Sequence, residues 1–383
     1  MMRTRLRGTR LALILAAAAF VGLPRSVPAD EPELTVGMLL AMSGPGIFVG
    51  KEMSQGTILA VEEINKGGGV AGRKLRLEIG DHKSGDTKAG VSEMERLVNV
   101  YQVPAVLTSY SAPTLGAQVI AEQSGVLLIN GGGWSPQLIG KPLLWNTRLT
   151  GDTTATATAR VAYDDGMRTL CMVYRQDPSG IAPAAVVRKW WEAKGGKILC
   201  EEKYDLNTTN FSAQIAEVRA SKADAMLIFS YGQQNAILIK QARDYGFSGP
   251  IYGIDFLPDN IAAAGKAIEG YKFAIDSFDP DAPDPFTQHF VAAYRARFHE
   301  EPDFYSANYY EAAYMLRDLI AAVAKEGKPI TGRNLDAKLR QMRSFPSVYG
   351  GKLTFRDDGT CQKPIAVFEI KDMKKVLLKK LTD

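Results

Sequence analysis

Residues 34–70 read LTVGMLLAMSGPGIFVGKEMSQGTILAVEEINKGGGV and decide the fold class. They predict a buried strand at 35–40, a loop containing Ser43 to Gly46, and an amphipathic helix at 51–66 closed by three glycines. The nearly continuous apolar character of the strand is typical of a parallel sheet buried on both faces. Because open α/β sheets bind small molecules at the carboxyl ends of their strands, we expect this loop to serve function.

The alternation of strand and helix continues through the first part of the chain. We predict strands at 35–40, 74–80, 104–109 and 126–130, and helices at 51–66, 87–101 and 113–123. Around Thr150 the alternation starts again. There we predict helices at 152–164, 181–194, 210–220 and 232–245, with strands at 168–174, 197–203, 224–230, 250–254 and 271–275. Both parts predict a doubly wound parallel sheet, so the chain is an α/β protein with two lobes.

The last hundred residues depart from this pattern. Helices are expected at 285–299, 307–325 and 333–342, and strands at 351–355 and 365–370. The helices outnumber the strands they could follow, so we expect them to pack back onto the first lobe. The lysine-rich segment from Lys371 to Lys380 is interpreted as a solvated face.

The first 29 residues have the composition of a secretory signal peptide. A basic start is followed by an apolar run from Leu11 to Leu23 and by the small-residue cleavage motif Val27-Pro28-Ala29. The run is shorter than the ~20 residues that a membrane-spanning helix needs. Removing the segment deletes five arginines and no acid, which leaves 41 basic residues against 42 acidic ones and lowers the net charge from +4 to −1. We therefore predict export to the periplasm and no nucleic-acid partner.

The cysteines and histidines give no sign of catalysis or metal binding. Cys171, Cys200 and Cys361 show no Cys-x-x-Cys spacing, so a zinc or redox motif is not expected. Cys171 and Cys200 lie in strands that should be neighbours, so they could form a disulfide, although buried free thiols are the more common outcome. The three histidines accompany no nucleophile motif and are explained as solvated positions. We expect no enzyme, no cofactor and no metal.

Polar and aromatic residues follow several predicted strands of the first lobe. Ser111 precedes Ala112 and Pro113 at the start of a helix, where a hydroxyl and free backbone N–H groups can bind a carboxylate. Gly132 and Trp134 follow the next strand, where glycine lets a ligand approach the backbone and an aromatic ring can form a wall. The alternatives are an ordinary helix cap and a flexible connector with Trp134 on the surface.

The second lobe shows the same placement. Tyr231 and Asp255 each follow a predicted strand, and Ser179 lies in the loop after another. A carboxylate in a cleft can pair with an ammonium group, and a hydrogen bond of that kind contributes about 1.5–3 kcal/mol. The alternative for Asp255 is a loop cap.

Three motifs together resemble the type I periplasmic binding proteins of the Leu/Ile/Val-binding class. They are AMSGP (41–45), AVEEINKGGG (60–69) and the Gln-Ala-Arg helix segment (241–243) before Gly246. The resemblance covers residue 34 to about 368. It implies two α/β lobes joined by three crossovers, with the ligand between the lobes. It also implies a lobe I of 30–150 plus 278–352, and a lobe II of 151–277 plus 353–383.

The resemblance also implies roles for single residues. Ser111 matches a serine that holds the ligand carboxylate, Tyr231 a tyrosine at the ligand ammonium, and Asp255 an acid that neutralises it. Gly132 and Trp134 match positions around the amino and carboxylate groups.

Two further matched positions shape the pocket. Val49 and Ser179 stand where branched-chain binders place aromatic rings, so the pocket is expected to be reshaped. The predicted ligand-binding set is Phe48, Val49, Ser111, Ala112, Gly132, Trp134, Ser179, Tyr231 and Asp255.

From these residues we predict a monomeric, non-enzymatic receptor that delivers a small amino acid, branched-chain or otherwise hydrophobic or aromatic, to an ABC transporter permease. An aromatic acid, an amide or a urea-like solute is the alternative ligand. A periplasmic ligand sensor would use the same fold and site, and an enzyme of the cleft is the weaker rival.

Overall fold

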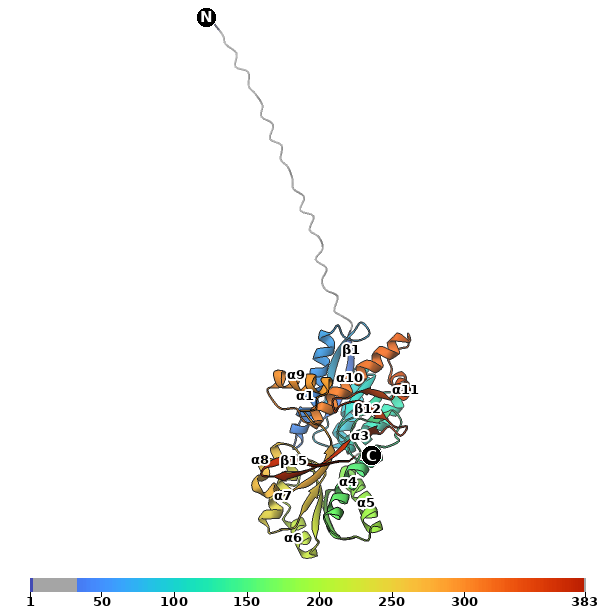
Figure 1. The fold of residues 1–383 in the computed structure, drawn as a ribbon. Coiled ribbons are helices and arrows are strands. Elements are labelled where there is room, and N and C mark those ends of the chain that lie inside the picture. Colours follow the sequence, from blue (N-terminus) through green and yellow to red (C-terminus); the bar gives the residue numbers. More distant parts are fainter. Residues whose placement is uncertain (3–32, 382–383) are drawn as a thin grey trace. The chain divides into compact units, whose positions relative to one another are not determined.

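The computed structural model describes residues 1–2 and 33–381. The predicted signal peptide falls almost entirely outside the described residues. Figure 1 shows two sheets, each flanked by helices. Among the described residues, no helix combines the length and apolar character that crossing a membrane requires.

The first sheet is parallel throughout and has the strand order β2-β1-β3-β4-β5. Its strands are β1 (Glu33–Leu40), β2 (Lys74–Asp81), β3 (Ala105–Thr108), β4 (Leu127–Asn130) and β5 (Leu144–Asn146). Its connections carry α1 (Ile47–Lys66), α2 (Thr87–Asn99), α3 (Ser111–Ser124) and the short η1 (Pro136–Leu138). The doubly wound arrangement predicted for this part is confirmed, although η1 and β5 were not anticipated. We call this sheet and its helices lobe I.

The second sheet has the order β15-β14-β10-β9-β8-β6-β7 and forms lobe II with its helices. Its strands are β6 (Thr169–Arg175), β7 (Lys197–Tyr204), β8 (Ala225–Phe229), β9 (Ile251–Gly253), β10 (Lys272–Asp276), β14 (Ile365–Lys371) and β15 (Lys374–Leu381). Its helices are α4 (Gly151–Asp164), α5 (Pro178–Ala193), α6 (Ser212–Ser221), α7 (Gln233–Asp244), α8 (Asp259–Ala264) and η2 (Gly265–Ile268). Five strands are parallel, and β14 and β15 add an antiparallel edge. The lysine-rich segment is therefore a paired strand. It was not predicted as a strand because its residues are mostly exposed and charged.

Three helices that follow β10 in the chain pack on lobe I, as expected from the sequence. They are α9 (Pro285–Phe298), α10 (Phe304–Lys325) and α11 (Gly332–Met342). Helix α10 lies against α1, and the hydroxyl groups of Tyr310 and Tyr314 both donate to Glu63 of α1. Gly56 allows this close contact, because a Cβ atom there would overlap the carbonyl oxygen of Ser306.

The chain passes between the two sheets three times: after β5, after β10 and after β13 (Cys361–Gln362). Strands β11 (Ser344–Pro346), β12 (Lys352–Phe355) and β13 form a small third sheet. Backbone carbonyls at Asp358 and Gly359 accept hydrogen bonds from Gly140 and Asn146 of lobe I. The predicted lobe boundary at 352/353 falls inside β12, and we propose moving it to Lys363 because of these contacts.

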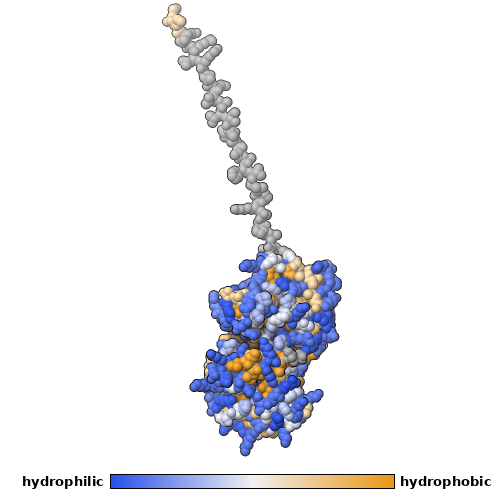
Figure 2. Space-filling model, viewed as in Figure 1, coloured by the Kyte–Doolittle hydropathy of each residue, from blue (hydrophilic) through white to orange (hydrophobic). Residues whose placement is uncertain are grey.

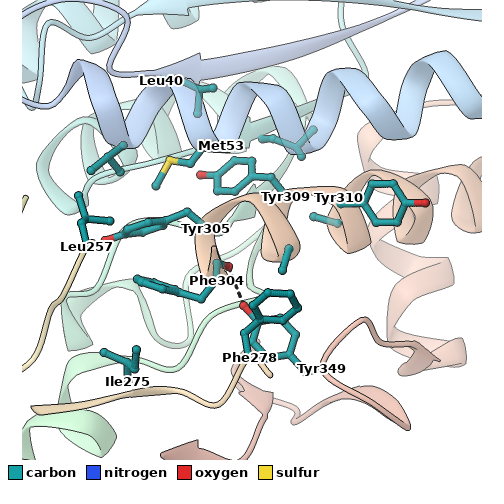
Figure 3. Close-up of a cluster of buried hydrophobic side chains, with 14 of the residues drawn as sticks. Leu40, Met53, Leu257, Ile275, Phe278, Phe304, Tyr305, Tyr309, Tyr310 and Tyr349 are labelled. Carbon is teal, nitrogen blue, oxygen red and sulfur yellow. Dashed lines mark hydrogen bonds between the residues drawn. The ribbon is translucent and has the colours of Figure 1, made fainter. Parts of the chain in front are cut away.

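Buried aromatic side chains fill the region where α10 begins (Figure 3). The Tyr349 hydroxyl donates to the carbonyl oxygen of Phe304 at 2.7 Å. Tyr305 lies between Met53 of α1 and Leu257 of lobe II in this view. The start of α10 thus packs against both lobes.

Each crossover carries a buried charged residue. Arg148 lies in the first crossover, Asp276 ends β10 at the second, and Lys363 lies in the third. Arg148 Nε is 3.9 Å from Asp276 Oδ2, and Lys363 Nζ is 2.5 Å from Glu311 Oε1 on α10. We call these four residues the hinge cluster. All its charges have an opposite charge nearby, as buried charges require.

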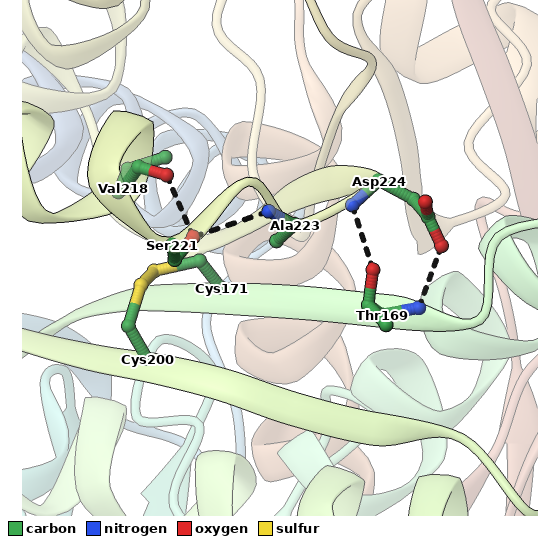
Figure 4. Close-up of a disulfide and its surroundings, with 7 residues drawn as sticks. All are labelled: Thr169, Cys171, Cys200, Val218, Ser221, Ala223 and Asp224. Atoms are coloured by element: carbon green, nitrogen blue, oxygen red, sulfur yellow. Dashed lines mark hydrogen bonds between the residues drawn. A yellow bond between two sulfur atoms is a disulfide. The ribbon is translucent and has the colours of Figure 1, made fainter.

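Cys171 and Cys200 form a disulfide between the paired strands β6 and β7 (Figure 4). The two cysteines are directly opposite in the strand register, which brings their Cα atoms to 4.6 Å. The expectation of buried free thiols is therefore wrong for this pair. Cys361 is a buried free thiol.

Candidate functional site

The candidate site is a cavity between the two lobes. It is lined by Val49, Tyr110, Ser111, Gly132, Trp134, Arg175, Ser179, Tyr231 and Tyr305. The cavity is narrow: the space between these side chains amounts to about 320 Å³ only when the adjoining open solvent is included. Most of the lining residues follow the carboxyl ends of strands, as the placement of the motifs predicted.

The cavity brings together six of the nine predicted residues: Val49, Ser111, Gly132, Trp134, Ser179 and Tyr231. Phe48, Ala112 and Asp255 are not among its lining residues. Phe48 is 45% exposed and borders a separate groove beside Lys51 and Asp303. Its side chain lies on the outer face of the first turn of α1, while that of the next residue, Val49, faces inward.

Ser111 is the first residue of α3 and not its cap, which corrects the sequence interpretation. The cap residue is Tyr110, whose backbone has a φ of 62°. The Ser111 hydroxyl oxygen accepts hydrogen bonds from the backbone N–H groups of Trp134 and Ser135, both at 2.9 Å. No acceptor for its own proton is found among the described residues. Together with the backbone N–H groups of Ser111 and Ala112, which have no partner within the helix, this proton can bind a carboxylate.

Trp134 is buried and not a surface residue. Its ring lies 6.2 Å from the Tyr231 ring and 6.3 Å from the Phe229 ring, measured between centroids. The indole N–H is buried, and no acceptor for it is found among the described residues. A buried donor without a partner costs free energy, so this group needs an explanation.

Asp255 is fully buried behind Tyr305. Its two carboxylate oxygens accept hydrogen bonds from the Gly232 N–H at 2.9 Å and the Tyr305 hydroxyl at 3.1 Å. The same hydroxyl accepts a bond from Arg148 Nη1 at 3.3 Å. Burial raises the pKa of Asp255, and the positive charge of Arg148 opposes that rise. The carboxylate thus has internal partners already.

The sequence reasoning missed Arg175, Tyr110 and Tyr305. Arg175 is the last residue of β6, so the rule that singled out Asp255 could have found it. Tyr110 directly precedes Ser111 and lies within the same motif. Tyr305 carried no signal, because it comes from α10, far away in sequence, and enters the site only through the packing of α10 on α1.

His82 is also different from what was expected. It is fully buried, and its Nε2 lies 2.8 Å from the Ser109 hydroxyl while its Nδ1 accepts from the Gly85 N–H at 3.1 Å. Burial lowers the pKa of His82 to about 4, so the ring is neutral at pH 7. The prediction that His82 is a solvated residue is therefore wrong. The side chain instead supports the loop after β2 through its hydrogen bonds.

Comparison with known proteins agrees with this geometry. Residues 33–375 match the family model described as periplasmic binding protein, and the chain belongs to this family. The Leu/Ile/Val-binding protein homolog 1 of Brucella melitensis is 26% identical over 359 residues, covering 91% of this chain and 92% of the relative. The resemblance to the type I, Leu/Ile/Val-binding class is thereby confirmed. Members of this family are solute-binding proteins.

Solved structures show the same two-lobed fold. The substrate-binding protein LivJ from Streptococcus pneumoniae, in complex with isoleucine, has a TM-score of 0.78 at 21% identity and covers 91% of this chain and 98% of its own. A solute-binding protein from Rhodopseudomonas palustris, in complex with benzoate, has a TM-score of 0.79 at 20% identity, with coverage of 92% and 98%. One fold thus accommodates both an amino acid and an aromatic acid, which leaves specificity to the cavity residues.

Proposed function

We propose that the protein is the periplasmic solute-binding component of an ABC importer and that it holds a small solute bearing a carboxylate in the interlobe cavity. The observation that carries the proposal is the end of α3. There Ser111, whose hydroxyl proton has no acceptor among the described residues, begins the helix and lines a cavity that both lobes share. The family membership supports the binding role.

The mechanism we infer is closure of the lobes around the solute. One lobe binds the carboxylate first, and contacts with the other lobe then favour the closed state by a shift of population. A membrane permease would recognise the closed form, and the protein would act as a monomer after export to the periplasm. No chemical step is part of this mechanism.

Two ligand classes fit a carboxylate at Ser111. Amino acids are favoured by the names of the relatives, which refer to leucine, isoleucine and valine. Carboxylic acids without an amino group are favoured by the geometry, because Asp255 does not line the cavity and its oxygens have partners. Val49 and Ser179 would leave the pocket without the rings expected of branched-chain binders.

Replacing Ser111 tests the proposal. Ser111→Ala should weaken every carboxylate ligand by about tenfold or more, because a hydrogen bond to a charged group is lost. Ligands would be found by a thermal-shift screen of amino acids, aromatic acids and amides, and affinities measured by calorimetry. Ser124→Ala, at the exposed far end of the same helix, is the matched control. Unchanged affinity in Ser111→Ala would refute the proposed carboxylate site.

A further inference from the structure

Arg175 is a buried cation that lines the cavity from lobe II. It is 4% exposed, and it also borders a second small cavity between Ser84 and Gln234. The guanidinium lies 5.2 Å from the Tyr231 ring centroid and 5.6 Å from that of Tyr110, measured from its central carbon. Two aromatic rings therefore hold the planar group in place at the wall of the cavity.

The internal partners of Arg175 use only part of its donors. Nη2 donates to the Ser179 hydroxyl at 2.9 Å, and Nε lies 2.6 Å from Asp177 Oδ2. No hydrogen bond from Nη1 to any other described residue is found. A guanidinium has five N–H donors in a planar fork, so it can still bind an acceptor.

Asp177 compensates the charge of Arg175 incompletely. Its other oxygen, Oδ1, caps α5 by accepting from the Ser179 and Gly180 N–H groups and from the Ser179 hydroxyl. The side chain of Asp177 is also 23% exposed, whereas that of Arg175 is 5% exposed. The helix start and solvent therefore share the negative charge, and the cavity side of the guanidinium remains positive.

Two further groups of the cavity are donors without an acceptor, beside the hydroxyl groups of Tyr110, Tyr231 and Tyr305, which can donate or accept. The Ser111 proton is free and the Trp134 indole N–H has no acceptor among the described residues. The carboxylate of Asp255 accepts from Tyr305 and Gly232 and does not line the cavity. A ligand ammonium would find hydroxyl oxygens but no carboxylate among the lining residues, whereas an anion would satisfy the donors already present.

On the basis of the proposed function, we infer that the ligand is an organic anion, a carboxylic acid without a balancing ammonium group, and that Arg175 supplies the charge that selects it over the zwitterionic amino acid. Ser179 is part of this arrangement. Its small side chain receives a hydrogen bond from the guanidinium, where an aromatic ring would displace it. The same substitution that makes the pocket unlike a branched-chain site thus makes room for the cation.

Matched ligand pairs on one carbon skeleton test the inference. We would measure 3-phenylpropanoate against phenylalanine and 4-methylpentanoate against leucine by calorimetry on the mature chain. In at least one pair the acid should bind at least tenfold more tightly than its amino acid. Arg175→Gln should weaken the acid by about tenfold or more and remove the preference, and Arg175→Lys should retain part of it.

Arg188→Gln is the control, because Arg188 pairs with Glu201 on the surface of the same lobe and does not line the cavity. It should leave both affinities unchanged. If Arg175 only supported the α5 cap, Arg175→Gln would lower the melting temperature without changing the ratio of the two affinities. That result, or an amino acid binding as tightly as its acid, would overturn the inference and leave the carboxylate site standing. Absence of binding by all four probes would reject both.

Discussion

The interlobe cavity and the hinge cluster both bury charged and polar groups, but the partners of these groups differ. In the hinge cluster each charge has an opposite charge within 4 Å that is itself buried, as in the contact between Lys363 and Glu311, although Arg148 Nε and both Asp276 oxygens make no hydrogen bond to the described residues. In the cavity, the described residues offer no acceptor to the Trp134 N–H, and the partner of Arg175, Asp177, is 23% exposed and leaves one donor of the guanidinium free among these residues. Charges whose partners are also buried hold the two lobes together, whereas donors that are incompletely compensated at the cavity wall are available to a ligand. The difference separates structural from binding residues.

The largest expected effect lies in the hinge cluster. Lys363→Met should lower the free energy of unfolding by about 3–5 kcal/mol, because it leaves the buried Glu311 carboxylate unpaired. Urea denaturation would measure the loss. Lys51→Met, which breaks an exposed pair with Glu300, should cost no more than about 1 kcal/mol. Equal effects of the two substitutions would contradict the distinction drawn between buried and exposed pairs.

A second test uses His82, which is buried beside the loops of the cavity but is fully hydrogen-bonded. Its pKa falls from 6.5 to about 4 on folding, so the unfolded chain takes up a proton before the folded one as the pH drops. Stability should therefore decrease by about 3 kcal/mol between pH 6.5 and pH 4 through this group. His82→Gln should abolish that part of the pH dependence.

Wild type and variant must be compared because other titrating groups change the stability with pH in the opposite direction. Burial raises the pKa of Glu52 to about 7 and that of Asp303 to about 6, so both lower stability as the pH rises through this range. His289→Gln, on the exposed face of α9, serves as control. If the difference between wild type and His82→Gln did not change with pH, His82 would not be a neutral buried ring.

The smallest effect on stability is expected within the cavity. Trp134→Phe keeps an aromatic ring against Phe229 and Tyr231 but removes the unpaired N–H. Unfolding should change by no more than about 1 kcal/mol, while ligand affinity should fall by about two- to tenfold. Trp191→Phe is the matched control, since its N–H donates to the Arg168 carbonyl. It should lower stability and spare affinity; the reverse pattern would contradict the assignment.

The fold could be predicted from the sequence because its signals are local. Alternating strands and helices, and glycines such as Gly68 after α1 with its φ of 98°, follow from periodicity and backbone freedom within a few residues. The strands that were not predicted depend on contacts with residues distant in the sequence. Strand β15 is exposed and charged and is defined by its pairing with β14, and β5 is only three residues long.

The candidate site was predictable to the extent that it depends on strand ends. Ser111, Gly132, Tyr231 and Ser179 follow strands and do line the cavity. Asp255 follows a strand as well, yet Tyr305 covers it, and that contact depends on how α10 packs some fifty residues further along the chain. That the Trp134 N–H lacks an acceptor could not be predicted, because whether a donor finds an acceptor depends on every residue that packs around it in the folded protein.

Strand β15 ends the sheet of lobe II and carries exposed Val376, Leu377 and Leu378 between pairs of lysines. Figure 2 shows apolar side chains gathered in the region where Figure 1 places this strand. A bare sheet edge of this composition invites pairing with the same edge of another molecule, and flanking lysines discourage it by charge repulsion. We therefore expect the lysines to hinder association between molecules. Replacing them should promote aggregation in concentrated solution and leave solute binding intact.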